Sequence, residues 1–263
     1  MKKLVVLGGG ESGVGAALLG KKKRYDVFVS DKGEVKKKYK EVLIHNEIEW
    51  EEQQHSLKKI LIADVVVKSP GITDKVEVVR QLVSKGVPVI SEIEFASQFT
   101  NANIIGITGS NGKTTTTMLT HHLLKEGGLR VEMAGNIGDS FAKQVAETDV
   151  EHYVLELSSF QLDGIKNFKP HIAVITNITP DHLDRYDYKF ENYIASKFRI
   201  AMNQTKDDYL IYDADDEVIV AYLKENHIQS KLLPFSLTKK LEQGAYLEEK
   251  NIKINIDNSQ LIM

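Results

Sequence analysis

Short apolar runs alternate with longer amphipathic stretches along most of this chain. Runs rich in β-branched residues favour strands, and stretches with a helical spacing of apolar residues favour helices. In the first part of the chain we expect strands at Leu4–Leu7, Asp26–Ser30, Ile60–Val67 and Val87–Ile90, and helices near Ser12–Lys22 and Lys75–Lys85. Strands that alternate with helices in this way are typical of an α/β fold with a parallel sheet.

A second series of the same kind begins with the apolar run Ile104–Thr108. Because two strand–glycine–helix starts occur in one chain, we predict two domains joined near residues 92–103. The first is a Rossmann-like parallel-sheet domain over residues 1–95. The second is a central α/β domain over residues 96–263, with a phosphate-binding loop (P-loop) and a small β-hairpin extension. Its further strands are expected at Arg130–Ala134, Tyr153–Leu157, His171–Thr176 and Tyr209–Tyr212, and its hairpin at Ala245–Leu247 and Ile252–Ile256.

Composition and charge exclude several classes of protein. The net charge is −3, and the lysine-rich stretches do not form a basic stripe of the kind that binds nucleic acid. The absence of cysteine excludes disulfides, thiolate metal sites and a cysteine nucleophile. No apolar run approaches the roughly 18 residues that span a bilayer, and the N-terminal run is too short for a signal peptide. We therefore expect a soluble, intracellular protein that binds neither nucleic acid nor membrane. A cytoplasmic location and a monomeric state are separate expectations, which composition does not establish.

The first glycine motif is Gly8-x-Gly10-x-x-Gly13, which follows an expected strand and opens an expected helix. Glycines allow the backbone to approach a diphosphate, and the start of the helix offers free N–H groups and the positive end of its dipole. Asp31, at the end of the next strand, is placed to accept hydrogen bonds from a ribose or a base. The motif indicates a diphosphate, and a nicotinamide dinucleotide satisfies it as well as a UDP-sugar does. A tight turn that binds no ligand is the simpler alternative.

The second glycine motif, Gly-x-x-Gly-Lys-Thr, lies between a strand and a helix. Ile107 stands where a full Walker A pattern has its first glycine, yet the remaining residues still offer N–H groups for phosphates, a lysine for the β- and γ-phosphates, and a hydroxyl for Mg²⁺. Four threonines then open the helix, although β-branched residues are poor helix formers. An ordinary turn before a helix is the alternative. The expected triphosphate-binding residues are Gly109, Ser110, Asn111, Gly112, Lys113, Thr114, Thr115 and Thr116.

Glu156 is a candidate magnesium ligand beside this loop. The expected strand Tyr153–Leu157 places its carboxylate near the carboxyl end of the sheet, where open α/β sheets bind their ligands. A glutamate in such a position is more often only solvated. Its combination with the glycine motif makes a metal ligand the favoured interpretation.

Four further segments complete a resemblance to a known family. Together with Gly109–Thr114, they closely resemble the Mur ligase family in order and spacing. Within the family, the Glu-Leu-Ser-Ser-Phe-Gln-Leu segment and the first glycine loop look like the members that add D-glutamate to UDP-N-acetylmuramoyl-L-alanine. The segments are Gly135–Gly138, Glu156–Leu162, Asn177–Tyr186 and Ser196–Ile200.

The resemblance implies an ATP-dependent ligase of peptidoglycan synthesis. ATP would convert the L-alanine carboxylate into an acyl phosphate, which the amine of D-glutamate then attacks. The catalytic residues would be Lys113, His182 and Lys197, and two Mg²⁺ sites would be held by Thr114, Thr115, Glu156, His182 and Lys197, with Lys197 carrying a carbamate. The UDP-substrate would be bound by Gly8, Gly10, Glu11, Ser12, Gly13, Asp31, Ser69, Pro70, Gly71, Asn136 and Ser158.

Two features of such ligases are expected to be absent from this chain. Family members carry a C-terminal domain that supplies most of the D-glutamate site, and a Gly-x-His-Asn segment late in the central domain. The sequence shows neither, so we expect a central domain that is incomplete at its C-terminal end and a fragment that is inactive by itself. Three other interpretations stay open: another Mur-type or folylpolyglutamate-type ligase, a nicotinamide-dependent oxidoreductase, and a catalytically dead nucleotide-binding module.

Overall fold

The computed structural model of the chain describes residues 1–256 and 259–263. Its strands form two sheets and alternate with helices, which confirms the predicted α/β class. The chain folds as two compact units. The first unit comprises Met1–Ala102, Leu129–Tyr153 and Phe160–Phe168, and the second comprises Asn103–Gly128, Val154–Ser159 and Lys169–Met263. A domain boundary between residues 95 and 96 stays a prediction.

The first sheet lies in the first unit and is entirely parallel. Its strand order is β3-β2-β1-β4-β5, as expected for a Rossmann-like fold. In register, Val5 of the central strand lies between Phe28 and Val66. The carboxyl ends of all five strands therefore meet at one edge of the sheet. The strands are β1 (Lys3–Leu7), β2 (Asp26–Ser30), β3 (Glu49–Glu51), β4 (Val65–Lys68) and β5 (Val89–Ile90).

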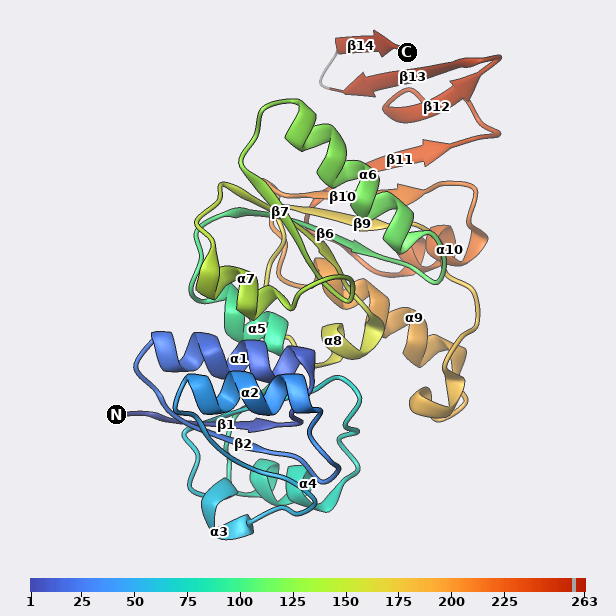
Figure 1. The fold of residues 1–263 in the computed structure, drawn as a ribbon. Coiled ribbons are helices and arrows are strands. Elements are labelled where there is room, and N and C mark those ends of the chain that lie inside the picture. The colour runs from blue at the N-terminus through green and yellow to red at the C-terminus, as the bar shows by residue number, and fades with distance from the viewer. Residues whose placement is uncertain (257–258) are drawn as a thin grey trace. The chain divides into compact units, whose positions relative to one another are not determined.

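Helices cover both faces of this sheet (Figure 1). The helices α1 and α2 lie on one face, and α3 and α4 lie on the other. On the α3/α4 side, Ile60 and Leu82 are fully buried against Val5 and Phe28. The helices of this part of the chain are α1 (Glu11–Lys22), α2 (Lys37–His45), α3 (Leu57–Ile60), α4 (Glu77–Ser84) and α5 (Glu92–Ser97).

Two of the predicted strands are shorter than expected. The prediction for Ile60–Val67 is wrong in its first half, because Ile60 closes the helix α3 with a hydrogen bond from its N–H to Ser56 O at 3.1 Å. Strand β4 starts only at Val65. The strand expected at Val87–Ile90 is reduced to its last two residues, after Pro88, which has no N–H to donate.

The second sheet has nine strands in the order β14-β13-β12-β11-β10-β9-β6-β8-β7. Strands β6, β9, β10, β11 and β12 are joined by parallel pairs. The strands are β6 (Asn103–Thr108), β7 (Val131–Gly135), β8 (His152–Glu156), β9 (Ile172–Ile175), β10 (Tyr209–Asp213), β11 (Lys231–Ser236), β12 (Gly244–Glu248), β13 (Asn251–Ile256) and β14 (Ser259–Ile262). The helices are α6 (Lys113–Glu126), α7 (Phe141–Glu147), α8 (Ser159–Asp163), α9 (Phe190–Phe198) and α10 (Glu217–Glu225), with short 3₁₀ turns η1 (Leu183–Tyr186) and η2 (Arg199–Ala201).

The expected hairpin near the C-terminus is present as the antiparallel pair β12–β13. Strand β14 extends it, because Ile262 and Leu261 pair with Lys253 and Ile254 of β13. The small extension is thus three-stranded rather than two-stranded (Figure 1). Among the described residues, none of the helices has the length and apolar character needed to cross a membrane.

Helix α5 carries two buried acidic side chains within the first unit. The carboxylate of Glu94 accepts hydrogen bonds from the backbone N–H groups of Lys166, Asn167 and Phe168 at 2.8–3.1 Å. Glu92 accepts one from Ala142 N on α7, and its other oxygen has no partner in the described part of the chain. Burial raises the pKa of Glu92 to about 8.

Candidate functional site

The first glycine loop connects β1 to α1 and is held by close backbone packing. Gly8 has a φ of +100°, and its N–H donates to Ser30 O at 2.9 Å. A Cβ at Gly13 would overlap the carbonyl oxygen of Gly8, so only glycine allows the helix to start this close to the strand. No side chain caps the start of α1. The helix therefore leaves N–H groups and the positive end of its dipole facing the loop.

Asp31 braces this loop from the end of β2. Its carboxylate accepts hydrogen bonds from Gly9 N at 2.6 Å and from Gly33 N at 2.7 Å. The first role of Asp31 is therefore to fix the loop. Because each carboxylate oxygen can accept more than one hydrogen bond, the side chain can still bind a ribose or a base.

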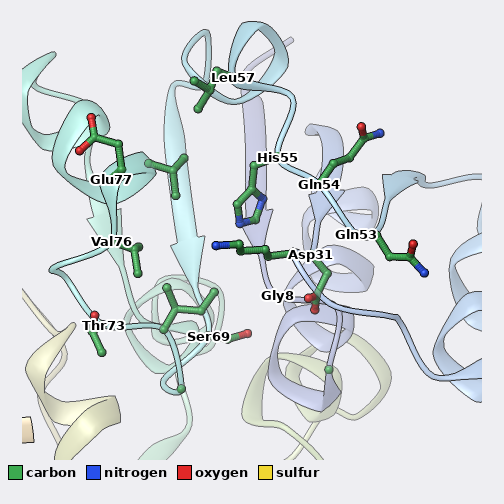
Figure 2. Close-up of a pocket in the computed structure, with 15 residues that line it drawn as sticks. Gly8, Asp31, Gln53, Gln54, His55, Leu57, Ser69, Thr73, Val76 and Glu77 are labelled. Carbon is green, nitrogen blue, oxygen red and sulfur yellow. The ribbon is translucent and has the colours of Figure 1, made fainter.

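A cavity of about 700 Å³ opens at the carboxyl ends of these strands (Figure 2). Five predicted binding residues line it, namely Gly8, Gly10, Asp31, Ser69 and Gly71. Of the other binding residues predicted within the first 95 positions, four do not line it, namely Glu11, Ser12, Gly13 and Pro70. Glu11 instead accepts a hydrogen bond from Tyr39 Oη at 3.0 Å. The structure thus gathers the loops after β1, β2 and β4 around one cavity.

The remaining wall of the cavity was not predicted from the sequence. It includes Gln53, Gln54, His55 and Leu57, which follow the short strand β3. Figure 2 shows His55 between Leu57 on one side and Asp31 with Gly8 on the other. Recognising β3 as a strand would have placed these residues at the ligand-binding edge. The other unpredicted lining residues are Lys32, Ile72, Thr73, Val76, Glu77 and Val78.

The second glycine loop, between β6 and α6, lies in the second unit and also needs its glycines. Gly109 has a φ of +153°, and a Cβ there would overlap Thr176 Oγ1. Gly112 precedes α6 in the left-handed conformation, with a φ of +78°. The N–H groups of Ser110 and Asn111 donate to Asn177, at its backbone O and its Oδ1, both at 2.9 Å.

The segment after β9 fixes the shape of the second loop. Ser110 Oγ donates to Thr179 O and accepts from Thr179 N, both at 2.9 Å. Thr176 Oγ1 donates to Asn111 O at 2.7 Å. The side chain of Ser110 and the backbone of Asn111 therefore stabilise the loop. Among the described residues, the N–H groups of Gly112, Lys113 and Thr114 donate to no protein acceptor, so these are the N–H groups best able to bind a phosphate.

The threonines at the start of α6 differ in their contacts. Thr114 Oγ1 donates to Glu156 Oε2 at 2.7 Å, and Glu156 is buried at the end of β8. Thr116 Oγ1 donates to Gly112 O at 2.9 Å, so its hydroxyl is used within the helix. Thr115 is exposed. The structure therefore pairs the predicted metal ligands Thr114 and Glu156.

Two lysines converge on the loop from different helices. Lys113 Nζ donates to the carbonyl oxygens of Gly109 and Ser110, both at 2.9 Å. Lys197, on α9, is buried and donates to the same Gly109 oxygen at 2.7 Å. Burial, and then the charge of Lys113, lower the pKa of Lys197 to about 7. A substantial fraction of Lys197 is therefore a neutral amine near neutral pH, the form that can act as a nucleophile.

Comparisons with known families identify the family of the chain. The family model described as the Mur ligase middle domain matches residues 107–262, which is more than half of the chain. The chain belongs to the Mur ligase family. The model of the MurD N-terminal domain matches residues 3–78 of the same Mur ligase chain.

Curated relatives of this Mur ligase chain are longer than the chain itself. The UDP-N-acetylmuramoylalanine–D-glutamate ligase of Christiangramia forsetii is 64% identical over 262 residues, which cover 100% of this chain and 59% of that protein. The ligase of the same name from Bacteroides fragilis is 51% identical over 269 residues, covering 100% of this chain and 61% of that protein. The chain thus spans about 60% of the length of these relatives.

Solved structures share the fold of this Mur ligase chain. The UDP-N-acetylmuramate:L-alanyl-γ-D-glutamyl-meso-diaminopimelate ligase of Neisseria meningitides matches with a TM-score of 0.67 and 18% identity, over 99% of this chain and 86% of that one. The UDP-N-acetylmuramate–alanine ligase of Thermotoga maritima matches with a TM-score of 0.57 and 20% identity, over 100% of this chain and 60% of that one. At these identities the likeness concerns the fold alone.

At three positions assigned through the Mur ligase resemblance, the surrounding residues do not by themselves indicate a binding role. His182 starts η1 with a left-handed backbone (φ +50°), and its Nε2 lies 3.5 Å from Asp181 Oδ2. Asn136 is exposed in the loop after β7, and Ser158 is half-buried after β8. Within residues 1–256 and 259–263, histidines and acids do not gather in a group of three that could hold a metal ion. The binding roles of His182, Asn136 and Ser158 stay predictions.

Proposed function

We propose that this chain carries the UDP-substrate site and the ATP-phosphate site of a ligase that joins D-glutamate to UDP-N-acetylmuramoyl-L-alanine. The names of the curated relatives support this pair of substrates, and the matched families support the class of enzyme. The observation that carries the proposal is the second glycine loop, where Lys113 and the Thr114–Glu156 pair lie together. We further propose that residues 1–95 form the domain that binds the UDP part of the substrate, and that residues 96–263 form the domain that binds ATP.

The second loop suits a triphosphate because of its N–H groups and its charge. The N–H groups at the start of α6 and the ammonium group of Lys113 would bind phosphate oxygens. The predicted set Gly109–Thr116 divides into two roles in this proposal. Gly112, Lys113 and Thr114 bind the phosphates, whereas Ser110 and Asn111 keep the loop in shape.

The Thr114–Glu156 pair suits Mg²⁺, because this ion takes few protein oxygens and keeps phosphate oxygens and waters as its other ligands. We favour Thr114 over Thr115 as the hydroxyl ligand, because the hydroxyl of Thr114 lies 2.7 Å from Glu156 Oε2. For a second Mg²⁺ we propose His182 and a carbamate on Lys197. The amine nitrogen of neutral Lys197 would attack the carbon of CO₂ and lose a proton, which gives a carboxylate-like ligand.

The first cavity suits the UDP part of the substrate. The start of α1 and the glycines of the first loop would bind the diphosphate, and Asp31 would bind the nucleoside. Ser69 and Gly71 complete the wall after β4. A Cβ added at Gly71 would meet no atom within 4 Å, so there is space for a ligand beside this residue.

The chemical problem is that a carboxylate is a poor electrophile. ATP held by Lys113 and the start of α6 would transfer its γ-phosphoryl group to the alanine carboxylate, giving an acyl phosphate and ADP, and Mg²⁺ held by Thr114 and Glu156 would neutralise phosphate charge. The residues of this chain hold the reacting groups in place and stabilise negative charge, which is the larger part of catalysis in phosphoryl transfer. We also propose that the enzyme acts in the cytoplasm.

The test is a calorimetric titration of the chain with UDP-N-acetylmuramoyl-L-alanine, and separately with ATP and Mg²⁺. We expect saturable binding of both, with weaker binding of UDP-muramoyl peptides of other lengths. Reduced nicotinamide dinucleotide serves as the control ligand for the oxidoreductase alternative. Tight binding of that dinucleotide, without binding of the UDP-substrate, would refute the proposal.

A further inference from the structure

His55 projects into the first cavity, and the chemistry assigned above to that cavity does not use it (Figure 2). The residue follows strand β3, the edge strand of the first sheet. Its Nδ1 lies 2.7 Å from Ser30 Oγ, whereas its Nε2 has no hydrogen-bond partner in the described part of the chain. One ring nitrogen is thus fixed by the protein and the other is available to a ligand.

The roles of the two ring nitrogens follow from the neighbours of Ser30. The hydroxyl of Ser30 has one proton, and it lies 2.7 Å from Glu51 Oε1. Glu51 also accepts hydrogen bonds from Ser56 N and Ser56 Oγ. Burial opposes ionisation of Glu51, but the hydrogen bonds from Ser56 and Ser30 outweigh it and lower its pKa. Glu51 is therefore an ionised acceptor that takes the proton of Ser30.

Because the proton of Ser30 points to Glu51, Ser30 Oγ must accept from His55. His55 therefore carries its proton on Nδ1. Burial lowers the pKa of His55, so the ring is neutral near neutral pH. In a neutral ring with Nδ1 protonated, Nε2 is a hydrogen-bond acceptor with no proton of its own. The hydrogen bonds that link Glu51, Ser30 and His55 thus leave Nε2 of His55 as an acceptor that faces the cavity.

The order of the strands indicates which part of a nucleotide His55 would meet. The end of β1 carries the glycine loop for the diphosphate, and the end of the neighbouring β2 carries Asp31. His55 follows β3, one strand further from the diphosphate loop. The apolar side chain of Leu57, which also follows β3, lines the same cavity and suits a flat base better than a sugar with its hydroxyls.

We propose that His55 Nε2 accepts a hydrogen bond from the imide N3–H of a uracil base and thereby selects uridine over cytidine nucleotides. Uracil has a donor at this ring position, whereas cytosine has a bare acceptor there, which would face the lone pair of Nε2. The inference rests on the proposed function, because it assumes that the cavity binds a nucleoside diphosphate. Ser30 is the positioning residue, since it fixes the protonation of the ring.

The experiment measures the affinities of UDP, CDP, 3-methyluridine diphosphate and 2′-deoxy-UDP for the parent chain and for His55→Ala. The parent should bind UDP more tightly than CDP or the 3-methyl analogue. His55→Ala should weaken UDP binding about threefold to tenfold, the value of one hydrogen bond, and should leave CDP binding unchanged or slightly stronger. His45→Ala is the matched control, because His45 is an exposed histidine at the end of α2.

Each arm separates the inference from its alternatives. Equal losses of UDP and CDP affinity in His55→Ala would overturn it, because His55 would then only support the cavity wall. A loss seen with UDP but not with 2′-deoxy-UDP would also overturn it, because His55 would then bind the ribose. Absence of UDP binding by the folded parent would refute the proposed function itself.

The tautomer gives a readout that does not depend on affinity. The ¹⁵N spectrum of the parent should show Nδ1 of His55 protonated and Nε2 unprotonated. Ser30→Ala removes the acceptor of the Nδ1 proton, so the ring should change to a mixture of tautomers and the preference for UDP over CDP should fall. A Nε2-protonated ring in the parent chain would overturn the inference, since that nitrogen could not accept the imide proton.

Discussion

Lys113 and Lys197 donate hydrogen bonds to the same atom, the carbonyl oxygen of Gly109, at 2.9 Å and 2.7 Å. The two side chains come from different helices, α6 and α9, and they differ in burial. The more buried amine, that of Lys197, has its pKa lowered to about 7 by burial and by the charge of Lys113. In our proposal the positive charge of Lys113 therefore binds phosphates, and the neutral amine of Lys197 forms the carbamate.

Removing the charge of Lys113 should raise the pKa of Lys197. Lys113→Met keeps most of the side-chain volume but removes one like charge from the neighbourhood of Lys197. A titration of Lys197 followed by NMR at its ¹⁵Nζ should place the midpoint near the value of about 7 in the parent and higher in the variant. Lys125→Met, at the exposed end of α6, is the control and should leave the midpoint unchanged. An unchanged midpoint in Lys113→Met would show that burial alone lowers this pKa.

Lys113→Ala should weaken ATP binding and leave the fold intact. The side chain is half-buried and donates to two carbonyl oxygens of its own loop, so its loss removes little packing. Loss of charged hydrogen bonds to phosphates should cost about tenfold to a hundredfold in affinity. Calorimetry with ATP and Mg²⁺ measures the effect, and Lys125→Ala is the matched control. A variant that binds ATP as tightly as the parent would show that the loop is not a phosphate site.

Thr114→Ala and Thr116→Ala should differ in their effect on magnesium. Thr114 contacts Glu156 at 2.7 Å, whereas the hydroxyl of Thr116 is bonded to Gly112 O within the helix. We expect Thr114→Ala to reduce the gain in ATP affinity that Mg²⁺ provides, and Thr116→Ala to leave that gain nearly unchanged. Titrations with ATP in the presence of Mg²⁺ and of a chelator measure it. Equal losses in the two variants would argue against Thr114 and Glu156 as the metal pair.

The sequence predicts those parts of the site that depend on local backbone chemistry. Glycines at the end of a strand indicate a tight loop wherever the chain folds, so Gly8–Gly13 and Gly109–Gly112 were found from the sequence. The pairing of Ser110 with Thr179 could not be found in this way, because a contact between distant segments has no local pattern. Nor does the sequence show that Thr114 is a hydroxyl that contacts Glu156, since that contact depends on where strand β8 places the carboxylate.

The parts that were missed have a physical cause in short or irregular elements. Strand β3 is only Glu49-Trp50-Glu51, and its two acids conceal the apolar alternation of a strand. His55 and the rest of that cavity wall were missed with it. The apolar run that begins at Ile60 predicts a strand there, but Ile60 lies in the helix α3 and its side chain is buried. Burial alone does not distinguish a helix from a strand in so short a run.

Glu92→Gln should remove a pH dependence from the stability of the first unit. Glu92 is buried, and burial raises its pKa in the folded chain to about 8, against an unfolded value of 4.5. Between these two pKa values Glu92 is protonated in the folded chain and ionised in the unfolded chain. The stabilisation by the neutral acid is therefore complete below the unfolded pKa and is lost as the pH rises through the folded pKa. The nearby charge of Glu11 acts in the same direction.

Urea unfolding measures this effect, with the fluorescence of Trp50 as the probe, because Trp50 is the single tryptophan and lies in the first unit. The parent should lose up to roughly 4 kcal/mol of stability between about pH 5 and about pH 9, as expected for a shift of this size in a buried group. Glu92→Gln keeps an acceptor for Ala142 N but cannot ionise, so its stability should change much less over this range. Glu126→Gln, exposed at the end of α6, is the control and should follow the parent. Parallel pH curves for the parent and Glu92→Gln would show that Glu92 does not remain protonated in the folded chain.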